Sequence, residues 1–486
     1  MKIEHFDVII VGAGLSGIGA ACYLTDHCRD RRYLILERRD ALGGTWDQFR
    51  YPGIRSDSDM QTLGYSFKPW SGAKAIADGP AILDYVQSAA NDYGVNQHIR
   101  FGHTLCAAHW RSEGACWTLD VGQKGSDPNV ILTCNVLLMC SGYYHYERAH
   151  DPQLPDLHKY LGKVVHPQFW PETLDYRDKR IVVIGSGATA MTLVPTLAKI
   201  AKHVTMVQRS PSYVISRPSK DRLTDALRKL LPPRLAYQIA RARNVFLQEM
   251  LYKATRIAPT WIKRQLINQV RNELGPDYDV EKHFTPRYGP WDQRLCLVPD
   301  GDLFAALNDR RADIVTDFIE GFTETGLQLG SGDHIDADIV VSATGLQLVV
   351  MGGAEFSVDG KVIEFSKLWT YKGLMVSDVP NMVSTFGYVN ASWTLRADLT
   401  AQWVCRLLNY MAKTRTQQVV PRVPEQLLDM PQRDWIDGFP AGYILRVMKY
   451  FPKQGDVAPW INTQDYRSDK KLFRQPFEAD DALHFR

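Results

Sequence analysis

The stretch DVIIVGAGLSG at residues 7–17 decides the fold of this chain. An apolar strand runs directly into three glycines, and an Ala-containing helix and a second strand, YLILE (33–37), follow. This order is the βαβ unit that binds a dinucleotide. Gly12 makes the tight turn, Gly14 lets the backbone approach a pyrophosphate, and Gly17 lets helix and strand pack closely. The phosphates are expected at the N-terminus of the helix.

A second copy of the pattern lies further along the chain. Residues 180–190 read RIVVIGSGATA, and a helix and the strand HVTMVQ (203–208) follow. A single G-x-G-x-x-G is a weak signal, but both copies have the required strand, turn and helix around them. The sequence therefore predicts an α/β protein with two Rossmann-like dinucleotide-binding domains.

The residue after each second strand distinguishes the two nucleotide sites. Glu37 lies 20 residues after Gly17, where a carboxylate accepts hydrogen bonds from ribose hydroxyls, as FAD or NAD requires. Arg209, followed by Ser210, lies 19 residues after Ala190, where a guanidinium pairs with a 2′-phosphate. The second nucleotide is therefore predicted to be NADPH. The alternative is that Arg209 is an ordinary solvated arginine.

Two return strands indicate the domain order. They are NVLLMCSG (135–142) and ADIVVSATG (337–345), and each ends in a turn of small residues. We expect residues 1–145 to form the first half of the FAD domain and residues 146–345 to form the NADPH domain. Residues 346–486 should complete the FAD domain and form the C-terminal region.

Residues 220–274 differ in charge from the rest of the chain. They hold twelve Lys and Arg against four Asp and Glu, and we expect a helical insertion over about 220–285 in the NADPH domain. Apolar residues recur at helical spacing after Pro232-Pro233, at Leu235, Ile239, Ala242, Phe246 and Met250. The favoured interpretation is a packed apolar stripe under a solvated basic face. The alternative is a basic amphipathic helix that contacts anionic lipid at the membrane periphery.

Composition limits which classes of protein this chain can belong to. The 486 residues are 45% hydrophobic and 23% charged, with a formal net charge of +3, so large cores are expected and nucleic acid is not the default partner. Eight scattered cysteines without a CxxC pair exclude a disulfide scaffold and a zinc–thiolate site, and suit a reducing cytoplasm. The start of the chain reads as a strand and no long apolar run follows, so neither a signal peptide nor a membrane span is expected.

The segment after the first nucleotide unit excludes a disulfide reductase. Such an enzyme needs a redox cysteine pair beside its Gly-Gly-Thr segment, whereas Gly43-Gly44-Thr45 is followed by Trp46 with no cysteine nearby. The stretch YPGIRSD (51–57) comes next and places Arg55 and Asp57 near the expected flavin. From the residues alone, these two charges could equally form a salt bridge within the loop.

The linker before the second nucleotide unit identifies a resemblance. It matches the pattern FxGxxxHxxxWP with tyrosine in place of the first phenylalanine, at Tyr160, Gly162, His166, Trp170 and Pro171. The chain resembles the class B flavoprotein monooxygenases, and within them the Baeyer–Villiger monooxygenases. The stretches 43–60, 166–171, 184–190, 291–299 (WDQRLCLVP) and 390–395 (NASWTL) especially resemble the ethionamide-activating branch, and the resemblance runs from residue 7 to about 460.

The resemblance implies cofactors and site residues. NADPH reduces FAD, the reduced flavin activates dioxygen, and Arg294, oriented by Asp57, stabilises the negative charge that develops. His166 couples the domains and is neither acid nor base. Implied FAD contacts are Gly12, Gly14, Ser16, Gly17, Glu37, Gly44, Thr45, Trp46, Asp57 and Leu105. Implied NADPH contacts are Arg55, Ser56, Gly185, Ser186, Gly187, Ala188, Thr189, Ala190, Arg209 and Ser210.

Two details complete this interpretation. Many relatives carry a lysine just before the catalytic arginine, and Gln293 stands there instead, so discrimination against NADH is expected to be weaker. His145, His150, His158 and His166 lie near one another in the sequence, but their spacing matches no zinc pattern and no metal is predicted.

The expected activity is insertion of one oxygen atom beside the carbonyl of a small apolar ketone, giving an ester or lactone, with sulfoxidation as a second activity. One alternative is a monooxygenase that acts mainly on sulfur or nitrogen, because NASWTL also resembles that neighbouring group. Another is an NADPH oxidase that transfers no oxygen. The expected partners are a ketone or thioether and dioxygen.

Overall fold

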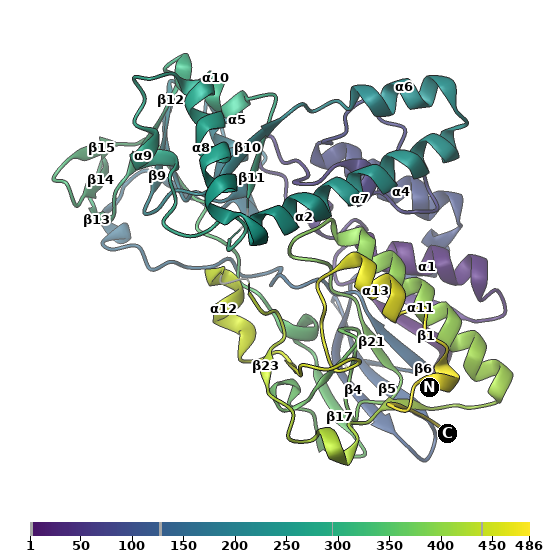
Figure 1. Ribbon diagram of the computed structural model, residues 1–486. Coiled ribbons are helices and arrows are strands. Elements are labelled where there is room, and N and C mark those ends of the chain that lie inside the picture. Colours follow the sequence, from purple (N-terminus) through teal and green to yellow (C-terminus); the bar gives the residue numbers. More distant parts are fainter. Residues whose placement is uncertain (1–2, 126–128, 294, 439–440) are drawn as a thin grey trace.

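The computed structural model describes residues 3–125, 129–293, 295–438 and 441–486. Two α/β bodies meet along an extended junction, each built on its own sheet (Figure 1). The helix-rich segment drawn in teal lies beside the junction, and the two chain ends belong to the same body. The prediction of two Rossmann-like units in an α/β protein is confirmed by the strands described next.

The first sheet combines strands from both ends of the chain. Its parallel part has β1 between β2 and β6, with β21 adding to the end of β6. Helices α1, α4 and α11 pack beside it. The strands are β1 (Glu4–Val11), β2 (Tyr33–Leu36), β3 (Ile99–Arg100), β4 (His103–Arg111), β5 (Cys116–Gln123), β6 (Val130–Met139), β17 (Glu355–Val358), β18 (Lys361–Val362) and β21 (Met382–Ser384). The helices are α1 (Leu15–His27), α4 (Gly79–Asp92) and α11 (Trp393–Thr414).

The second sheet is wholly parallel, in the order β12-β9-β8-β16-β7. Its strands are β7 (Lys163–Val165), β8 (Arg180–Ile184), β9 (His203–Gln208), β12 (Ala312–Thr316) and β16 (Ile339–Ser342), with α5 (Ala188–Leu197) and α10 (Asp302–Asn308) packed beside it. Every strand comes from the middle of the chain. The division into domains, with boundaries at 145 and 345, stays a prediction.

Helices occupy the part of the chain where the insertion is predicted. Between the paired strands β10 (Val214–Arg217) and β11 (Cys296–Pro299) lie α6 (Arg222–Leu230), α7 (Pro233–Ile257), α8 (Pro259–Leu274) and α9 (Val280–Phe284). Prolines occupy the first turns of α7 and α8, where a missing N–H costs nothing. None of the helices in the described part of the chain has the length and apolarity needed to cross a lipid bilayer.

The expected packing of α7 is wrong. Leu235, Ile239, Phe246 and Met250 are 41–50% exposed, so the apolar stripe faces outward. The inward side includes the buried residues Ala236, Tyr237, Ala240, Arg241, Val245 and Thr255. Helical periodicity finds an apolar stripe but does not say which side packs, and here small alanines together with polar side chains meet the neighbouring elements.

The remaining elements are short helices and small sheets. They are α2 (Thr45–Gln48), α3 (Met60–Leu63), α12 (Gly442–Met448), α13 (Tyr466–Leu472), the hairpin sheet of β13 (Ile319–Phe322), β14 (Gly326–Leu329) and β15 (His334–Asp336), and the short pairs β19 (Thr370–Tyr371) with β20 (Met375–Val376), β22 (Val419–Pro421) with β25 (Leu483–Phe485), and β23 (Arg433–Asp434) with β24 (Lys453–Gln454).

Candidate active site

A cavity of about 1040 Å³ lies where the two bodies meet, and both glycine turns open onto it. The predicted cofactor residues that line it are Gly12, Gly14, Ser16, Glu37, Gly44, Thr45, Trp46, Arg55, Ser56, Asp57, Leu105, Gly185, Ser186, Gly187, Ala188, Thr189, Arg209 and Ser210. The structure thus brings together side chains that are far apart in the sequence.

Gly17 and Ala190 lie behind the cavity wall. A Cβ atom at Gly17 would lie 1.9 Å from the carbonyl oxygen of Gly12, and Ala190 is completely buried. Both positions therefore hold helix against strand, which is the packing role that the third small residue of the fingerprint has.

Glu37 anchors the first glycine turn. One carboxylate oxygen accepts a 2.7 Å hydrogen bond from the backbone N–H of Ala13, and the other accepts one from Arg39 at 2.9 Å. Glu37 is only 5% exposed, and burial raises the pKa of its carboxyl group. Each oxygen keeps a second lone pair for a ribose hydroxyl at the cavity edge.

Glu37→Arg is expected to weaken FAD binding roughly ten- to hundredfold, because hydrogen bonds to a charged group contribute about 1.5–3 kcal/mol. Flavin fluorescence released on dilution measures the loss. Glu37→Gln, which keeps an acceptor, should lose less flavin, and Glu113→Arg on the exposed β4–β5 turn should lose none. Full flavin retention by Glu37→Arg would place the FAD site elsewhere.

The second glycine turn leaves room for a phosphate. Gly185 has a positive φ of 130°, and a Cβ there would lie 2.4 Å from the carbonyl oxygen of Ala343, whereas a Cβ at Gly187 would meet nothing within 4 Å. The Ser186 hydroxyl donates to the carbonyl oxygen of Ser210 at 2.9 Å. Arg209 beside it is exposed at the cavity rim, where its guanidinium is accessible to a phosphate.

The loop at 51–58 joins the two bodies. The Arg55 guanidinium forms an ion pair with Asp302 at the start of α10, so its carboxylate partner lies in the other body. Ser56 is almost fully buried and its hydroxyl accepts from the N–H of Ser58 at 2.9 Å. Asp57 is exposed and lines the cavity.

Helix α7 holds the segment that follows this loop. The Asn244 amide donates to one oxygen of Asp59 at 2.8 Å, and Gln248 donates to the other at 3.1 Å. Arg241 donates to the carbonyl oxygens of residues 61, 62 and 64 and forms a buried 3.2 Å ion pair with Asp398 of α11. Burial raises the pKa of Asp398 to about 6 despite this guanidinium. The insertion therefore supports the loop that carries Asp57.

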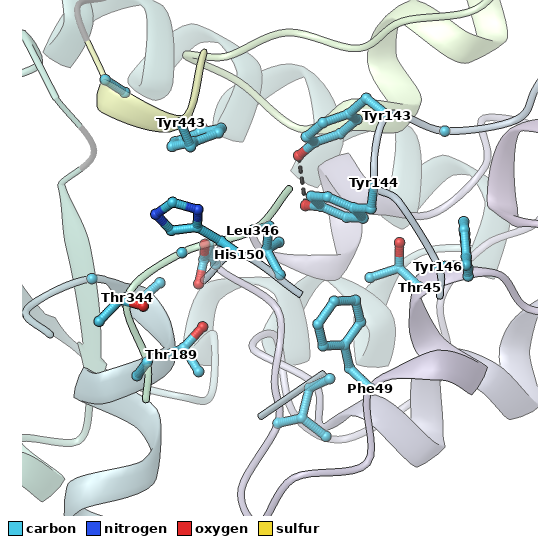
Figure 2. Close-up of a pocket in the computed structure, with 18 of the residues that line it drawn as sticks. Thr45, Phe49, Tyr143, Tyr144, Tyr146, His150, Thr189, Thr344, Leu346 and Tyr443 are labelled. Atoms are coloured by element: carbon cyan, nitrogen blue, oxygen red, sulfur yellow. Dashed lines mark hydrogen bonds between the residues drawn. The ribbon is translucent and has the colours of Figure 1, made fainter. Parts of the chain in front are cut away.

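Aromatic side chains form one wall of the cavity (Figure 2). The hydroxyl groups of Tyr143 and Tyr144 are 2.6 Å apart, and Tyr143 stacks on Trp393 with ring centres 5.1 Å apart. The Trp393 indole N–H donates to the hydroxyl of Ser16 at 2.7 Å. Tyr443 of α12 and His150 also line the cavity (Figure 2). Burial lowers the pKa of His150, so the imidazole is neutral at pH 7.

The linker fingerprint lies behind the cavity. His166 donates through Nε2 to the carbonyl oxygen of Gly345 at 3.2 Å and accepts through Nδ1 from the N–H of Gln168 at 3.1 Å, which fixes its tautomer. Burial lowers its pKa. The Tyr160 hydroxyl donates to the carbonyl oxygen of Ala337 at 3.0 Å, and a Cβ at Gly162 would clash with its ring. Trp170 packs edge-on against Tyr176, and Pro171 follows it.

Arg294 lies outside the residues that the structure describes. The described residues Gln293 and Cys296, on either side of it in the sequence, line the cavity. Its catalytic role stays a prediction.

The sequence reasoning missed two groups. The aromatic wall gave a weak signal, because Tyr143 and Tyr144 directly follow the return strand, where ligands bind in such sheets. No sequence signal indicated the second group, which is the contacts that Arg241, Asn244 and Gln248 make with the loop. These residues lie about 180 positions from their partners and meet them only in the folded chain.

Comparison with known proteins defines the family. A model for flavin-binding monooxygenase-like proteins matches residues 73–277, and one for the NAD(P)-binding Rossmann-like domain matches residues 10–72. The FAD-containing monooxygenase EthA of Mycobacterium tuberculosis is 48% identical over 483 residues, covering 99% of this chain and 98% of EthA. The probable FAD-binding monooxygenase AlmA of Acinetobacter baylyi is 46% identical over 484 residues, covering 99% and 96%. The chain therefore belongs to the EthA-type FAD-containing monooxygenases.

Solved structures agree on the fold. An oxidized steroid monooxygenase bound to NADP superposes with a TM-score of 0.79 at 21% identity, covering 99% of both chains. Cyclohexanone monooxygenase from Rhodococcus sp. Phi1, bound to NADP+, superposes with a TM-score of 0.77 at 18% identity, and both chains are fully covered.

Proposed function

We propose that this enzyme inserts one oxygen atom from dioxygen beside the carbonyl of a small, apolar ketone, giving an ester or lactone, and that it oxidises thioethers as a second activity. The observation that carries the proposal is the single cavity on which two nucleotide turns and an aromatic wall converge. One structural neighbour is named as a cyclohexanone monooxygenase, and this supports a ketone as substrate.

FAD and NADPH are the cofactors of this monooxygenase. The described residues fit both groups: Glu37 offers carboxylate lone pairs at the first turn, and the backbone at Gly187 faces open space at the second. FAD, once reduced by NADPH, supplies the activation of dioxygen. We propose the domain boundaries and the individual cofactor contacts as the sequence predicted them.

The protein's own part in the reaction is electrostatic and steric. Negative charge develops on the transferred oxygen, and a fixed cation in a dry site stabilises such charge far better than water does. We assign that cation to Arg294, because a guanidinium stays protonated, and its orientation to Asp57. The bonds from α7 to Asp59 hold the Asp57 loop in position.

The cavity wall favours apolar substrates and excludes water. Phe49, Leu346 and Trp393 present carbon surface to the cavity, while Tyr143 and Tyr144 satisfy each other's hydroxyl groups. Water in such a site would divert the activated oxygen to hydrogen peroxide. His150, whose pKa burial lowers, also lines the cavity.

Paired substrates test the proposal. Purified enzyme is given a ketone and a thioether of equal size under ¹⁸O₂, and NADPH use, labelled product and hydrogen peroxide are measured together. We expect labelled ester nearly stoichiometric with NADPH, and slower sulfoxide formation. Sulfoxide with no ester from linear, cyclic or aryl ketones would make the enzyme a heteroatom monooxygenase. Hydrogen peroxide alone with every substrate would make it an oxidase.

A further inference from the structure

The outer side of α6, α7 and the start of α8 concentrates apolar surface. Nine large apolar side chains there are 41–84% exposed: Leu223, Leu230, Leu235, Ile239, Phe246, Leu247, Met250, Ile257 and Trp261. We call this surface the α6–α8 face. It holds a disproportionate share of the exposed large hydrophobic side chains in the described chain, and such clusters mark interaction sites.

Exposed basic side chains lie on and beside the same helices. Lysines and arginines that are exposed and form no ion pair with another described residue are Lys220, Arg222, Lys229, Arg234, Lys253 and Arg264. Other arginines of the segment already have carboxylate partners, such as Arg243 with Asp221 and Arg256 with Asp292. The six cations are therefore available to an external anionic partner.

Helix α7 carries apolar side chains on both its inward and its outward side, whereas an ordinary surface helix has a polar outward side. Its inward side carries Arg241, Asn244 and Gln248, which bind backbone and carboxylate groups of the loop below. Its outward side carries the apolar stripe from Leu235 to Ile257, which at 1.5 Å per residue spans about 33 Å. Neither polar solvation nor internal packing accounts for an apolar stripe of this length facing outward.

We propose that the α6–α8 face binds the surface of an anionic lipid membrane, with α7 lying in the plane of the headgroups. Helices that lie in this plane combine apolar side chains directed into the acyl region with Lys and Arg at its edge. The guanidinium of Arg467, which forms an ion pair with Glu249, lies 5.6 Å from the ring centre of Phe246, so a charged pair lies beside the stripe. A second copy of the chain suits the face less well, because both copies would present unpaired cations.

Membrane binding would serve an enzyme with apolar substrates. Val245 of α7 packs against Tyr388, and Tyr388 lines the cavity. The helix that contacts lipid would thus adjoin the cavity wall, close to where apolar compounds dissolve. This inference concerns the surface and is independent of which ketone or sulfur compound is oxidised.

Vesicle flotation of the purified holoenzyme tests the proposal. Vesicles of phosphatidylcholine alone are compared with vesicles containing about 30% phosphatidylglycerol, at low and high salt. The apolar variant is Ile239→Ser/Met250→Ser, and the charge variant is Lys229→Glu/Lys253→Glu. The matched controls are Val362→Ser and Lys361→Glu on β18, both exposed. Flavin content shows that each variant is folded.

We expect binding to the anionic vesicles and its loss at high salt. The charge variant should bind at least about 25-fold more weakly, since each basic residue near an anionic surface contributes roughly fivefold. The apolar variant should bind the anionic vesicles at least about tenfold more weakly than wild type. The controls should bind like wild type. Absence of flotation, equal binding to both vesicles, or equal loss in the controls would overturn the proposal. A changed oligomeric state in the α6–α8 variants without vesicle binding would assign the face to a second copy instead.

Discussion

Arg294→Ala is expected to abolish ester formation while NADPH still bleaches the flavin. Hydride transfer depends on how the two cofactors are placed, whereas oxygen transfer needs a fixed cation beside the charge that develops. Losing one such preorganised charge costs roughly 3–4 kcal/mol, or a hundred- to thousandfold in the step that it assists. Rapid mixing with NADPH under anaerobic conditions measures the first step, and ester yield per NADPH in air measures the second.

Two further variants show whether the guanidinium acts as assigned. Asp57→Ala should give a milder loss, because the cation remains but is less well oriented. Arg294→Lys should restore little, since an ammonium lacks the planar fork that a carboxylate holds. Flavin and NADPH binding should stay intact in Arg294→Ala. An ester yield near the wild-type value in this variant would refute the role that we assign to Arg294.

Arg209→Ala is expected to raise the KM for NADPH about ten- to hundredfold and to change the KM for NADH little. A charge-assisted pair with a phosphate contributes roughly 1.5–3 kcal/mol, and only NADPH carries the 2′-phosphate. Steady-state kinetics with each cofactor give the ratio of the KM for NADPH to the KM for NADH. Arg217→Ala, exposed on β10 and away from the cavity lining, is the matched control.

Gln293→Lys should lower the KM for NADPH relative to the KM for NADH, because it adds a second cation at the cavity. Equal effects of Arg209→Ala on NADPH and NADH would show that Arg209 does not read the phosphate. That outcome would leave the NADPH preference to the backbone and serines around Ser210.

Much of the fold was predictable because the two glycine turns are local signals. The strands expected at 180–184 and 203–208 have those bounds in the structure, and those expected at 7–11 and 33–37 differ only at one end. Glu37 and Arg209 were found by counting residues from the turns, and both line the cavity. Short-range spacing determines these features, so a single sequence is enough to reveal them.

The rest depends on contacts between distant parts of the chain. The stripe on α7 was visible in the sequence, but its outward orientation follows from the bonds that Arg241 and Asn244 make on the opposite side. Pairing of Arg55 with Asp302, rather than within its own loop, depends on how the two bodies meet. The aromatic wall likewise combines residues from 143 to 443, which no local pattern relates.

The nested order of the two sheets determines when each body can form during synthesis. The second sheet is complete once β16 has left the ribosome, at residue 342. The first sheet begins at residue 4, yet β21 and α11, which packs on α1, are made only at residues 382–414. The apolar surface of α1 therefore waits for its partner while more than half of the chain is translated. The half of the enzyme that is made first is therefore the last that can finish folding, and its exposed apolar surface favours aggregation until then.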